Sequence, residues 1–173
     1  MKKEGFTILE MMAVIAIIAI LAGILIPAVT TVRKNANKVK AKALISHLVT
    51  AIESYKSDAG FYPADYITVD LASEALYIYL TNRFYDSVAN EYYGPYIEPK
   101  TDWVGNSDGD GDSEFVDPWG NPYEYEADTD ALVSTRPPFH NVYTFDIYSL
   151  GPDGVTGAGF AAGNQPDDIN NWK

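Results

Sequence analysis

The first part of the chain is apolar without interruption. From Met11 to Val29, a run of 19 residues, no side chain is charged or strongly polar. A helix of that length covers about 28 Å, close to the hydrocarbon thickness of a bilayer. Two alternatives fit less well. A core helix of a small domain would need a polar face toward water, which this run lacks, and a secretory signal peptide would need a small-residue cleavage site, which Thr30 and the residues after it do not provide. The pattern therefore predicts a membrane-spanning helix over residues 6–29.

Helical spacing continues beyond this run. Apolar residues recur every three or four positions as far as Ala59, where Gly60 and then Pro63 provide a stop signal. One helix from Phe6 to Ala59 would be about 80 Å long at 1.5 Å per residue. A globular domain does not need so long a rod, whereas a filament core does. We expect residues 36–55 to pack on a sheet of the same chain.

The remaining residues show shorter patterns. Residues 61–104 are expected to be irregular apart from one short helix over Leu71–Phe84. Residues 123–125 and 141–150 are rich in aromatic and β-branched side chains, which predicts strands. Two or three antiparallel strands packed on one long helix give a small α+β domain.

Aromatic residues crowd one part of this domain. Packing in the core and at subunit contacts explains them, because tyrosine combines a large apolar area with a polar tip. A carbohydrate-binding strip is the alternative. The residues are Tyr77, Tyr79, Phe84, Tyr85, Tyr92, Tyr93 and Tyr96.

The charge is divided between two parts of the chain. The net charge is −12, but residues 1–42 hold seven basic and two acidic residues, and residues 43–173 hold five basic and 22 acidic residues. We expect no nucleic-acid partner for the acidic part. The basic residues of the segment 33–42 form either a solvated face or pairs with acidic neighbours in a filament. Cysteine is absent, which excludes disulfides and thiolate sites.

Two residues are unusual for a plain membrane anchor. Glu10 lies at the edge of the apolar run, where an unpaired carboxylate is costly in hydrocarbon, so it is a candidate functional residue. Its alternative role is that of an interfacial residue reaching the headgroups. Pro27 lies inside the run, where it is expected to kink or locally melt the helix.

A known N-terminal pattern contains both residues. It consists of a basic leader, the Gly5–Phe6 junction, Glu10 as the fifth residue after that junction, and Pro27 as the twenty-second. This pattern resembles the class III signal of the type IV pilin-like family. The resemblance implies that a prepilin peptidase removes residues 1–5 and methylates the new amine. It also implies that Glu10 pairs with the free amino terminus of a neighbouring subunit.

Four segments that lie after the predicted long helix narrow the resemblance to the major pseudopilins of type II secretion. They are Gly60 to Pro63, Asp117 to Tyr123, Phe145 to Gly154, and Asp167 to Ile169 with Trp172. The resemblance implies a pilin-like fold, with the hydrophobic half of the helix protruding from a globular domain over 30–173. Residues 64–115 match poorly and read as an insertion.

The function implied is structural. The chain would be a single-pass inner-membrane protein with a cytoplasmic N-terminus, which polymerises into a helical filament through an assembly platform and minor pseudopilins. The filament would be the piston-like pseudopilus of protein secretion, in the periplasm. The alternatives are a type IV pilus or other filament at the cell surface, or a membrane-tethered calcium-binding module that does not polymerise.

The C-terminal loop is a candidate calcium site. Residues 151–166 contain five glycines and few core-forming side chains, so the loop needs a brace, and a calcium ion would also relieve the repulsion between adjacent carboxylates. The resemblance implies a metal-braced loop held by carboxylates, backbone oxygens and one hydroxyl. The matching residues are Leu150, Asp153, Val155, Thr156, Asp167 and Asp168.

A second acidic loop is another candidate. Asp108, Asp110 and Asp112 alternate with other residues, as at the start of an EF-hand loop, and Glu114 follows. The glutamate expected at position 12 of such a loop is replaced by Trp119. A solvated acidic loop is the alternative.

We expect no enzyme activity. His47 and His140, the two histidines of the chain, lie in no catalytic motif, and no nucleophile elbow, P-loop or dinucleotide fingerprint occurs in the sequence.

Overall fold

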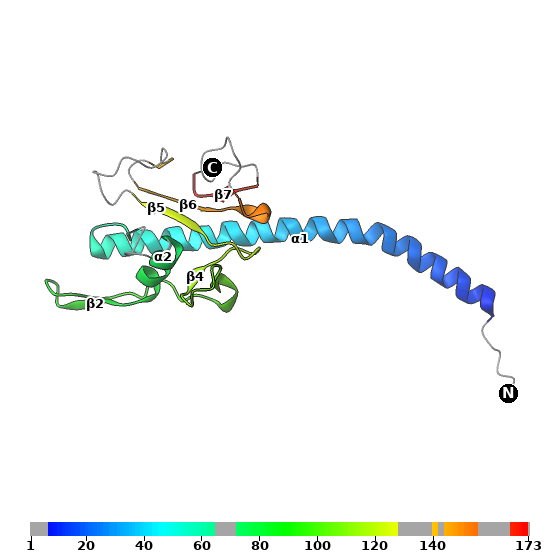
Figure 1. The fold of residues 1–173 in the computed structure, drawn as a ribbon, viewed down its shortest axis with the longest axis horizontal. Helices are drawn as coiled ribbons and strands as arrows, with labels where there is room; N and C mark the ends of the chain where they lie inside the picture. The colour runs from blue at the N-terminus through cyan, green and yellow to red at the C-terminus, as the bar shows by residue number, and fades with distance from the viewer. Residues whose placement is uncertain (1–6, 65–71, 128–139, 142–143, 156–166, 173) are drawn as a thin grey trace, which may run out of the picture. The chain divides into compact units, whose positions relative to one another are not determined.

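The computed structural model shown in Figure 1 describes residues 7–64, 72–127, 140–141, 144–155 and 167–172. The chain divides into two compact units, Met1–Asn37 and Lys38–Lys173. In chain order, the helices and strands are α1 (Ile8–Ala59), α2 (Ala72–Thr81), β1 (Phe84–Asp86), β2 (Glu91–Tyr93), the 3-10 helix η1 (Thr101–Trp103), β3 (Val104–Gly105), β4 (Glu114–Phe115), β5 (Glu124–Ala127), β6 (Phe145–Ser149), the 3-10 helix η2 (Gly151–Asp153) and β7 (Ile169–Asn170).

The long N-terminal helix is present as predicted over the described residues. α1 contains 52 residues and ends at Ala59. The next residue, Gly60, adopts the left-handed conformation with φ of 83°, and its amide donates to the Lys56 carbonyl at 2.8 Å. This is a glycine-terminated helix end, where a Cβ would be strained. The helix is continuous through Pro27, so the predicted local melting does not occur.

Apolar side chains in the first unit are exposed. Ile8 is 82% exposed and Ile24 is 67% exposed. α1 is the one helix among the described residues that is long and apolar enough to cross a membrane, with a mean hydropathy of 2.9 in its most apolar window. The predicted limits of the membrane part, 6–29, and of the domain, 30–173, both fall inside α1 and stay predictions.

The described residues of the second unit form three small antiparallel sheets. β5, β6 and β7 form a three-stranded sheet with β6 in the centre, while β1 pairs with β2 and β3 pairs with β4. The register places Tyr125 opposite Ile147 and Ser149 opposite Ile169. The predicted α+β class is confirmed, with a long helix and small antiparallel sheets.

Two details of the predicted strands are wrong. Residues 61–104 were expected to hold one helix, but they also contain β1, β2, η1 and β3. The predicted strand 141–150 is shorter, because the Asp146 carboxylate accepts hydrogen bonds from the amides of His140 at 2.7 Å and Asn141 at 3.0 Å. His140, Asn141 and Thr144 therefore lie outside the strand, and β6 begins at Phe145.

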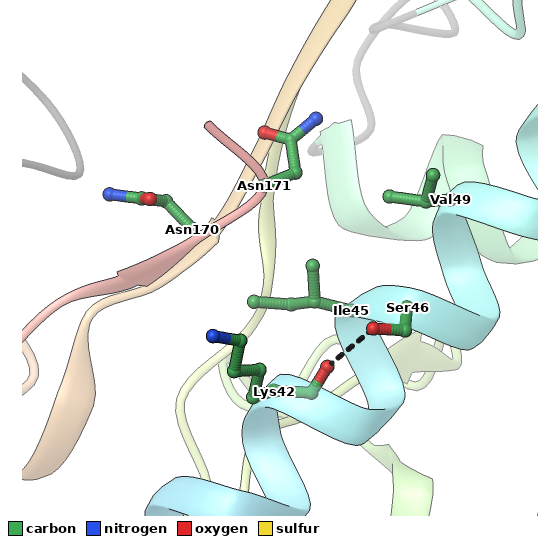
Figure 2. Close-up of a pocket in the computed structure, with 6 residues that line it drawn as sticks. All are labelled: Lys42, Ile45, Ser46, Val49, Asn170 and Asn171. Carbon is green, nitrogen blue, oxygen red and sulfur yellow. Dashed lines mark hydrogen bonds between the residues drawn. The ribbon is translucent and has the colours of Figure 1, made fainter. Parts of the chain in front are cut away.

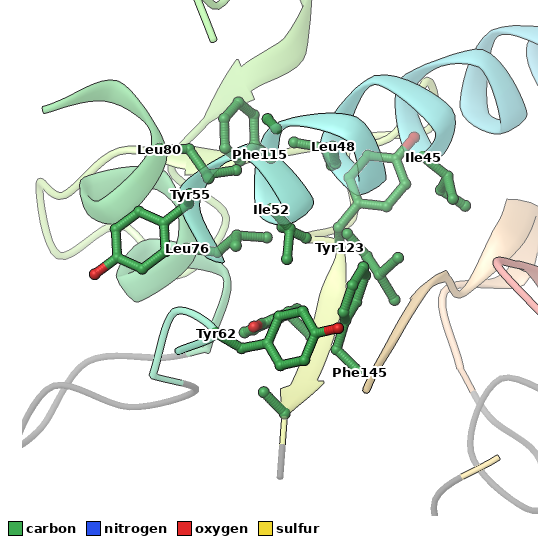
Figure 3. Close-up of a cluster of buried hydrophobic side chains, with 14 of the residues drawn as sticks. Ile45, Leu48, Ile52, Tyr55, Tyr62, Leu76, Leu80, Phe115, Tyr123 and Phe145 are labelled. Atoms are coloured by element: carbon green, nitrogen blue, oxygen red, sulfur yellow. The ribbon is translucent and has the colours of Figure 1, made fainter. Parts of the chain in front are cut away.

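The core joins the second part of α1 to α2 and the sheets, as Figure 3 shows. One face of α1 supplies Leu44, Leu48 and Ile52, and β5 and β6 supply Tyr125 and Ile147. The spacing of the α1 residues by four places them on one side of the helix. This arrangement confirms that the 36–55 segment packs on the domain of its own chain.

The aromatic cluster is divided between core and surface. Tyr77, Tyr79, Phe84 and Tyr96 pack against the core, which agrees with the packing interpretation. The rings of Tyr79, Phe84 and Tyr96 each lie within 6 Å of the Tyr55 ring. Tyr85 and Tyr92, in contrast, are exposed on β1 and β2.

Candidate assembly and metal sites

The first candidate site is the start of α1, where Thr7 and Glu10 form a reciprocal cap. The Glu10 carboxylate accepts hydrogen bonds from the Thr7 amide at 2.9 Å and the Thr7 hydroxyl at 2.8 Å. The Glu10 amide donates to Thr7 Oγ1 at 3.2 Å. This is a capping box, which satisfies amides that a helix start otherwise leaves without a partner. Gly5 and Phe6, the predicted processing site, lie outside the described residues.

Two hydroxyl groups from the next helical turn donate to the carbonyl of Pro27 inside α1. Thr30 Oγ1 donates to the Pro27 carbonyl at 2.8 Å, and Thr31 Oγ1 donates to the same oxygen at 3.2 Å. Threonine hydroxyls that bond back to the helix satisfy polar groups without a partner from outside the helix. The predicted assembly role of Pro27 stays a prediction.

The C-terminal loop brings together two segments that carry the predicted metal ligands. The β6–β7 pairing places Ser149 opposite Ile169. Leu150 comes directly after Ser149, and Asp168 comes directly before Ile169, so both predicted ligands adjoin this pair. A Cβ built at Gly151, whose φ is 70°, would lie 2.6 Å from the Asp167 carbonyl oxygen and 3.2 Å from Asp167 Oδ2. The turn at η2 therefore fits against Asp167 only with glycine at position 151.

The other predicted ligands of this loop have different exposures. Asp153 is exposed, and its Oδ1 accepts the Val155 amide at 3.0 Å. Asp168 is 8% exposed. Thr156 lies outside the described residues. Carboxylate and carbonyl oxygens are the ligands that calcium prefers. The carboxylates of Asp153, Asp167 and Asp168, all three among the described residues, do not form a group with oxygens within 4.8 Å of one another.

Two residues support this loop that the sequence analysis did not identify as site residues. Asn121 Nδ2 donates to the Gly151 carbonyl at 2.8 Å. The buried Asp117 carboxylate accepts the amides of Trp119 at 2.9 Å and Asn121 at 3.0 Å, and the Ser149 hydroxyl at 2.6 Å. Asp117 thus ties the turn before β5 to the end of β6. The turn-forming Asp-Pro-Trp-Gly-Asn sequence could have indicated this role of Asp117, because an aspartate in a turn commonly accepts a hydrogen bond from the backbone amide two residues later.

The second acidic loop forms a cluster with a partner from α2. Carboxylate oxygens of Glu74, Asp108 and Asp110 lie within 4.8 Å of one another, and this cluster could hold a metal ion. Glu74 is 2% exposed. Asp112 and Glu114, the other predicted ligands, are not members of this cluster. Glu114 is buried and accepts the Ser73 hydroxyl at 2.8 Å.

A small opening lies between α1 and the end of β7, as Figure 2 shows. Its volume is about 270 Å³, and it is lined by Lys42, Ile45, Ser46, Val49, Asn170 and Asn171. The Asn171 side chain already serves the sheet, because its Oδ1 accepts the Ile147 amide at 3.1 Å and its Nδ2 donates to the Phe145 carbonyl at 3.1 Å. The lining carries no pair of groups for acid–base or nucleophilic catalysis.

Two family models together cover nearly the whole chain. Residues 1–26 match the prokaryotic N-terminal methylation motif, and residues 28–172 match the type II secretion system (T2SS), protein G. The chain belongs to the type II secretion system protein G family. The resemblance inferred from the sequence is confirmed.

Two relatives in the protein G family align with this chain over more than nine-tenths of their length. The type II secretion system core protein G of Pseudomonas aeruginosa is 33% identical over 172 residues, which cover 99% of this chain and 96% of that protein. The Vibrio cholerae protein of the same name is 34% identical, with coverage of 99% and 92%. The crystal structure of the major pseudopilin from the type 2 secretion system of enterohaemorrhagic Escherichia coli is similar at a TM-score of 0.47 and 23% identity, covering 85% of this chain and 96% of that one.

Proposed function

We propose that this chain is inserted into the inner membrane, loses residues 1–5 to a prepilin peptidase, and polymerises into a pseudopilus. Its function would be structural, as the major subunit of the filament that drives protein secretion. The main support is the first part of α1, where large apolar side chains are exposed, as with Leu25 at 59% and Ile26 at 65%. A bilayer covers such a surface before assembly, and neighbouring copies of the same helix cover it afterwards.

Glu10 would promote the transfer of the helix from the bilayer to the filament by pairing with a neighbouring copy. In the single chain its carboxylate is held by Thr7. Cleavage before Phe6 creates a new amine close to this cap, and in the filament the amine of one copy would pair with Glu10 of its neighbour. Opposite charges attract more strongly in the low dielectric of a helical core than in water. The assembly platform and minor pseudopilins are the further partners that we propose.

A calcium ion would brace the C-terminal loop. The proposed ligands are Leu150, Asp153, Val155 and Thr156 on one segment and Asp167 and Asp168 on the other. The close approach of Gly151 to Asp167 supports this proposal, because it holds the two segments together. The cluster of Glu74, Asp108 and Asp110 is a second candidate for calcium.

The test of the proposed function is the Glu10→Ala variant, produced in cells that carry the secretion machinery. We expect mass spectrometry to find the variant cleaved before Phe6 and electron microscopy to find no filaments. Glu53→Ala, which changes an exposed glutamate in the second part of α1, is the matched control and should assemble normally. Wild-type chains that stay monomeric and retain residues 1–5 would refute the proposal. Filaments on the cell surface would favour the surface-filament alternative.

A further inference from the structure

α1 carries five basic residues soon after its apolar run. They form the basic segment (residues 33–42), and all five side chains are exposed. None of these side chains makes an ion pair or hydrogen bond with a described residue. Between Glu10 and Glu53 the chain contains no acidic residue, so this part of α1 has no counter-charge of its own. The five basic residues are Arg33, Lys34, Lys38, Lys40 and Lys42.

The first two basic residues lie at the depth of lipid headgroups when the apolar run spans a bilayer. Arg33 and Lys34 follow Val29, the last residue of the run, by four and five positions, which is at most about 8 Å along a helix. The headgroup region beside the hydrocarbon core is roughly 5–7 Å thick. Long basic side chains at the end of a membrane helix reach into that region. Lys40 and Lys42 come 11 and 13 positions after Val29, which is up to about 20 Å.

The orientation of the chain does not explain this charge. In the proposed orientation, the basic segment follows the membrane helix on the side away from the cytoplasm. Basic residues close to a membrane helix are ordinarily found on the cytoplasmic side. Two lysines, Lys2 and Lys3, precede the apolar run, whereas five basic residues follow it. The basic segment therefore calls for a role other than setting the orientation.

The basic residues are spread around α1. Successive residues of a helix are about 100° apart, so Arg33 and Lys34 point in different directions. At this spacing the five positions of the basic segment cover more than half of the circumference of the helix. A docked protein contacts a narrower arc, whereas lipid headgroups surround a membrane helix on every side. This distribution favours lipid as the partner.

Neighbouring copies are a poor source of counter-charge while they share one bilayer. Identical helices inserted side by side hold identical residues at the same depth, so Arg33 of one copy is level with Arg33 of the next. The nearest carboxylates of α1 belong to Glu10 and Glu53, 23 and 20 positions from Arg33, which is about 30 Å along a helix. Salt screens interactions between exposed charges beyond about 10 Å. The phosphate groups of lipids are a closer source of negative charge.

We propose that Arg33 and Lys34 bind the headgroups of anionic phospholipids before the chain assembles. The Arg33 guanidinium donates two parallel hydrogen bonds to phosphate oxygens, and the Lys34 ammonium adds a point charge. The bound lipid neutralises like charges that would otherwise repel when copies meet in the bilayer. This inference rests on the proposed function, because it requires the apolar part of α1 to lie in a membrane.

The lipid selectivity of the full chain tests this binding. The chain is reconstituted into phosphatidylcholine vesicles that contain a trace of spin-labelled phosphatidylglycerol or of spin-labelled phosphatidylcholine. Electron paramagnetic resonance then measures the fraction of each label that is held at the protein. We expect phosphatidylglycerol to associate roughly three- to tenfold more strongly than phosphatidylcholine, because basic groups near the surface attract anionic lipid. Salt at about 1 M should remove most of this preference, since the Debye length falls to about 3 Å.

Two double variants show where the preference arises. Arg33→Gln/Lys34→Gln should bring the ratio of the two association constants close to one. The matched control, Lys40→Gln/Lys42→Gln, removes the same charge farther from the apolar run and should keep most of the preference. Circular dichroism and resistance to carbonate extraction verify that each variant is helical and inserted. The salt response of the wild-type chain requires no substitution, so it tests the proposal even where a variant does not fold.

The outcomes separate this lipid site from the function on which it rests. A ratio near one for the wild-type chain, or an unchanged ratio for Arg33→Gln/Lys34→Gln, would overturn lipid binding. Equal losses in the two double variants would also overturn it, because the distance from the apolar run would then have no effect. Unchanged selectivity with fewer filaments from Arg33→Gln/Lys34→Gln would assign these residues to carboxylates of a neighbouring copy instead. A wild-type chain that does not insert into the vesicles would overturn the proposed function as well.

Discussion

The two parts of α1 differ in what covers their apolar side chains. In the first part, Leu21 and Leu25 are 54% and 59% exposed, whereas in the second part Leu44 and Leu48 are 4% and 0% exposed. The first part is apolar on every side, so the sheets of one domain could not cover it. The second part is apolar on one face and polar on the other, as expected for a helix that packs on its own domain.

This difference shows that one helix can be specified for two environments. Under the proposed function, the first part depends on a bilayer or on neighbouring copies, whereas the second packs on residues of the same chain. A substitution in the second part should therefore affect folding, and a substitution in the first part should affect assembly.

The largest effect on folding is expected from a leucine in the second part. Leu48→Ala should lower the free energy of unfolding by about 2–5 kcal/mol, because it leaves a cavity in the core. Leu25→Ala makes the same change in the first part and should leave the stability nearly unchanged. Thermal unfolding of the full chain in detergent, followed by circular dichroism, measures both. Equal losses of unfolding free energy in Leu48→Ala and Leu25→Ala would contradict the distinction between the two parts.

Calcium removal should also act on the second unit alone. A metal that binds only the folded state stabilises it by about 2.7 kcal/mol at a concentration 100-fold above its Kd. A chelator should therefore lower the melting temperature, and Asp167→Ala/Asp168→Ala should reproduce that loss and abolish the response. Asp108→Ala/Asp110→Ala is the comparison variant. If it alone removes the response, the ion occupies the Glu74 cluster instead.

A smaller loss is expected at the turn that supports the C-terminal loop. Asp117→Ala should cost about 1–3 kcal/mol, because it removes the acceptor of the Ser149 hydroxyl and of two turn amides. Asp102→Ala removes an exposed carboxylate and is the matched control. Urea unfolding measures the difference. An unchanged midpoint for Asp117→Ala would show that the turn is held by other contacts.

The smallest effect concerns pH. Burial raises the pKa of Glu124, and repulsion from Glu126 and Glu114 adds to this shift. Because the folded state favours the protonated carboxyl, its contribution to stability is complete below the ordinary glutamate pKa and is lost as the pH rises through the folded-state value. Glu124→Gln should therefore raise the melting temperature slightly at pH 7 and not below pH 4, while Glu98→Gln, an exposed control, should change neither. A rise of equal size at both pH values would exclude titration as the cause.

Much of the fold was predictable because the decisive patterns are local. A long apolar run followed by helical spacing predicted α1, and the glycine after Ala59 predicted where the helix ends. The hairpin of β1 and β2 was not predicted, because its strands have three residues each and its aromatic residues resemble those of the core. Only packing against α1 distinguishes Phe84, which faces the core, from Tyr85, which does not.

The sequence by itself determined the long helix, the uneven charge and the N-terminal processing pattern, because each depends on residues that are neighbours in the chain. Tertiary structure decided which residues meet across long separations. It placed Glu74 beside Asp108 and Asp110, and it connected Asn121 to Gly151. Such contacts depend on how helices and sheets pack, and packing is set by the shapes of many side chains together.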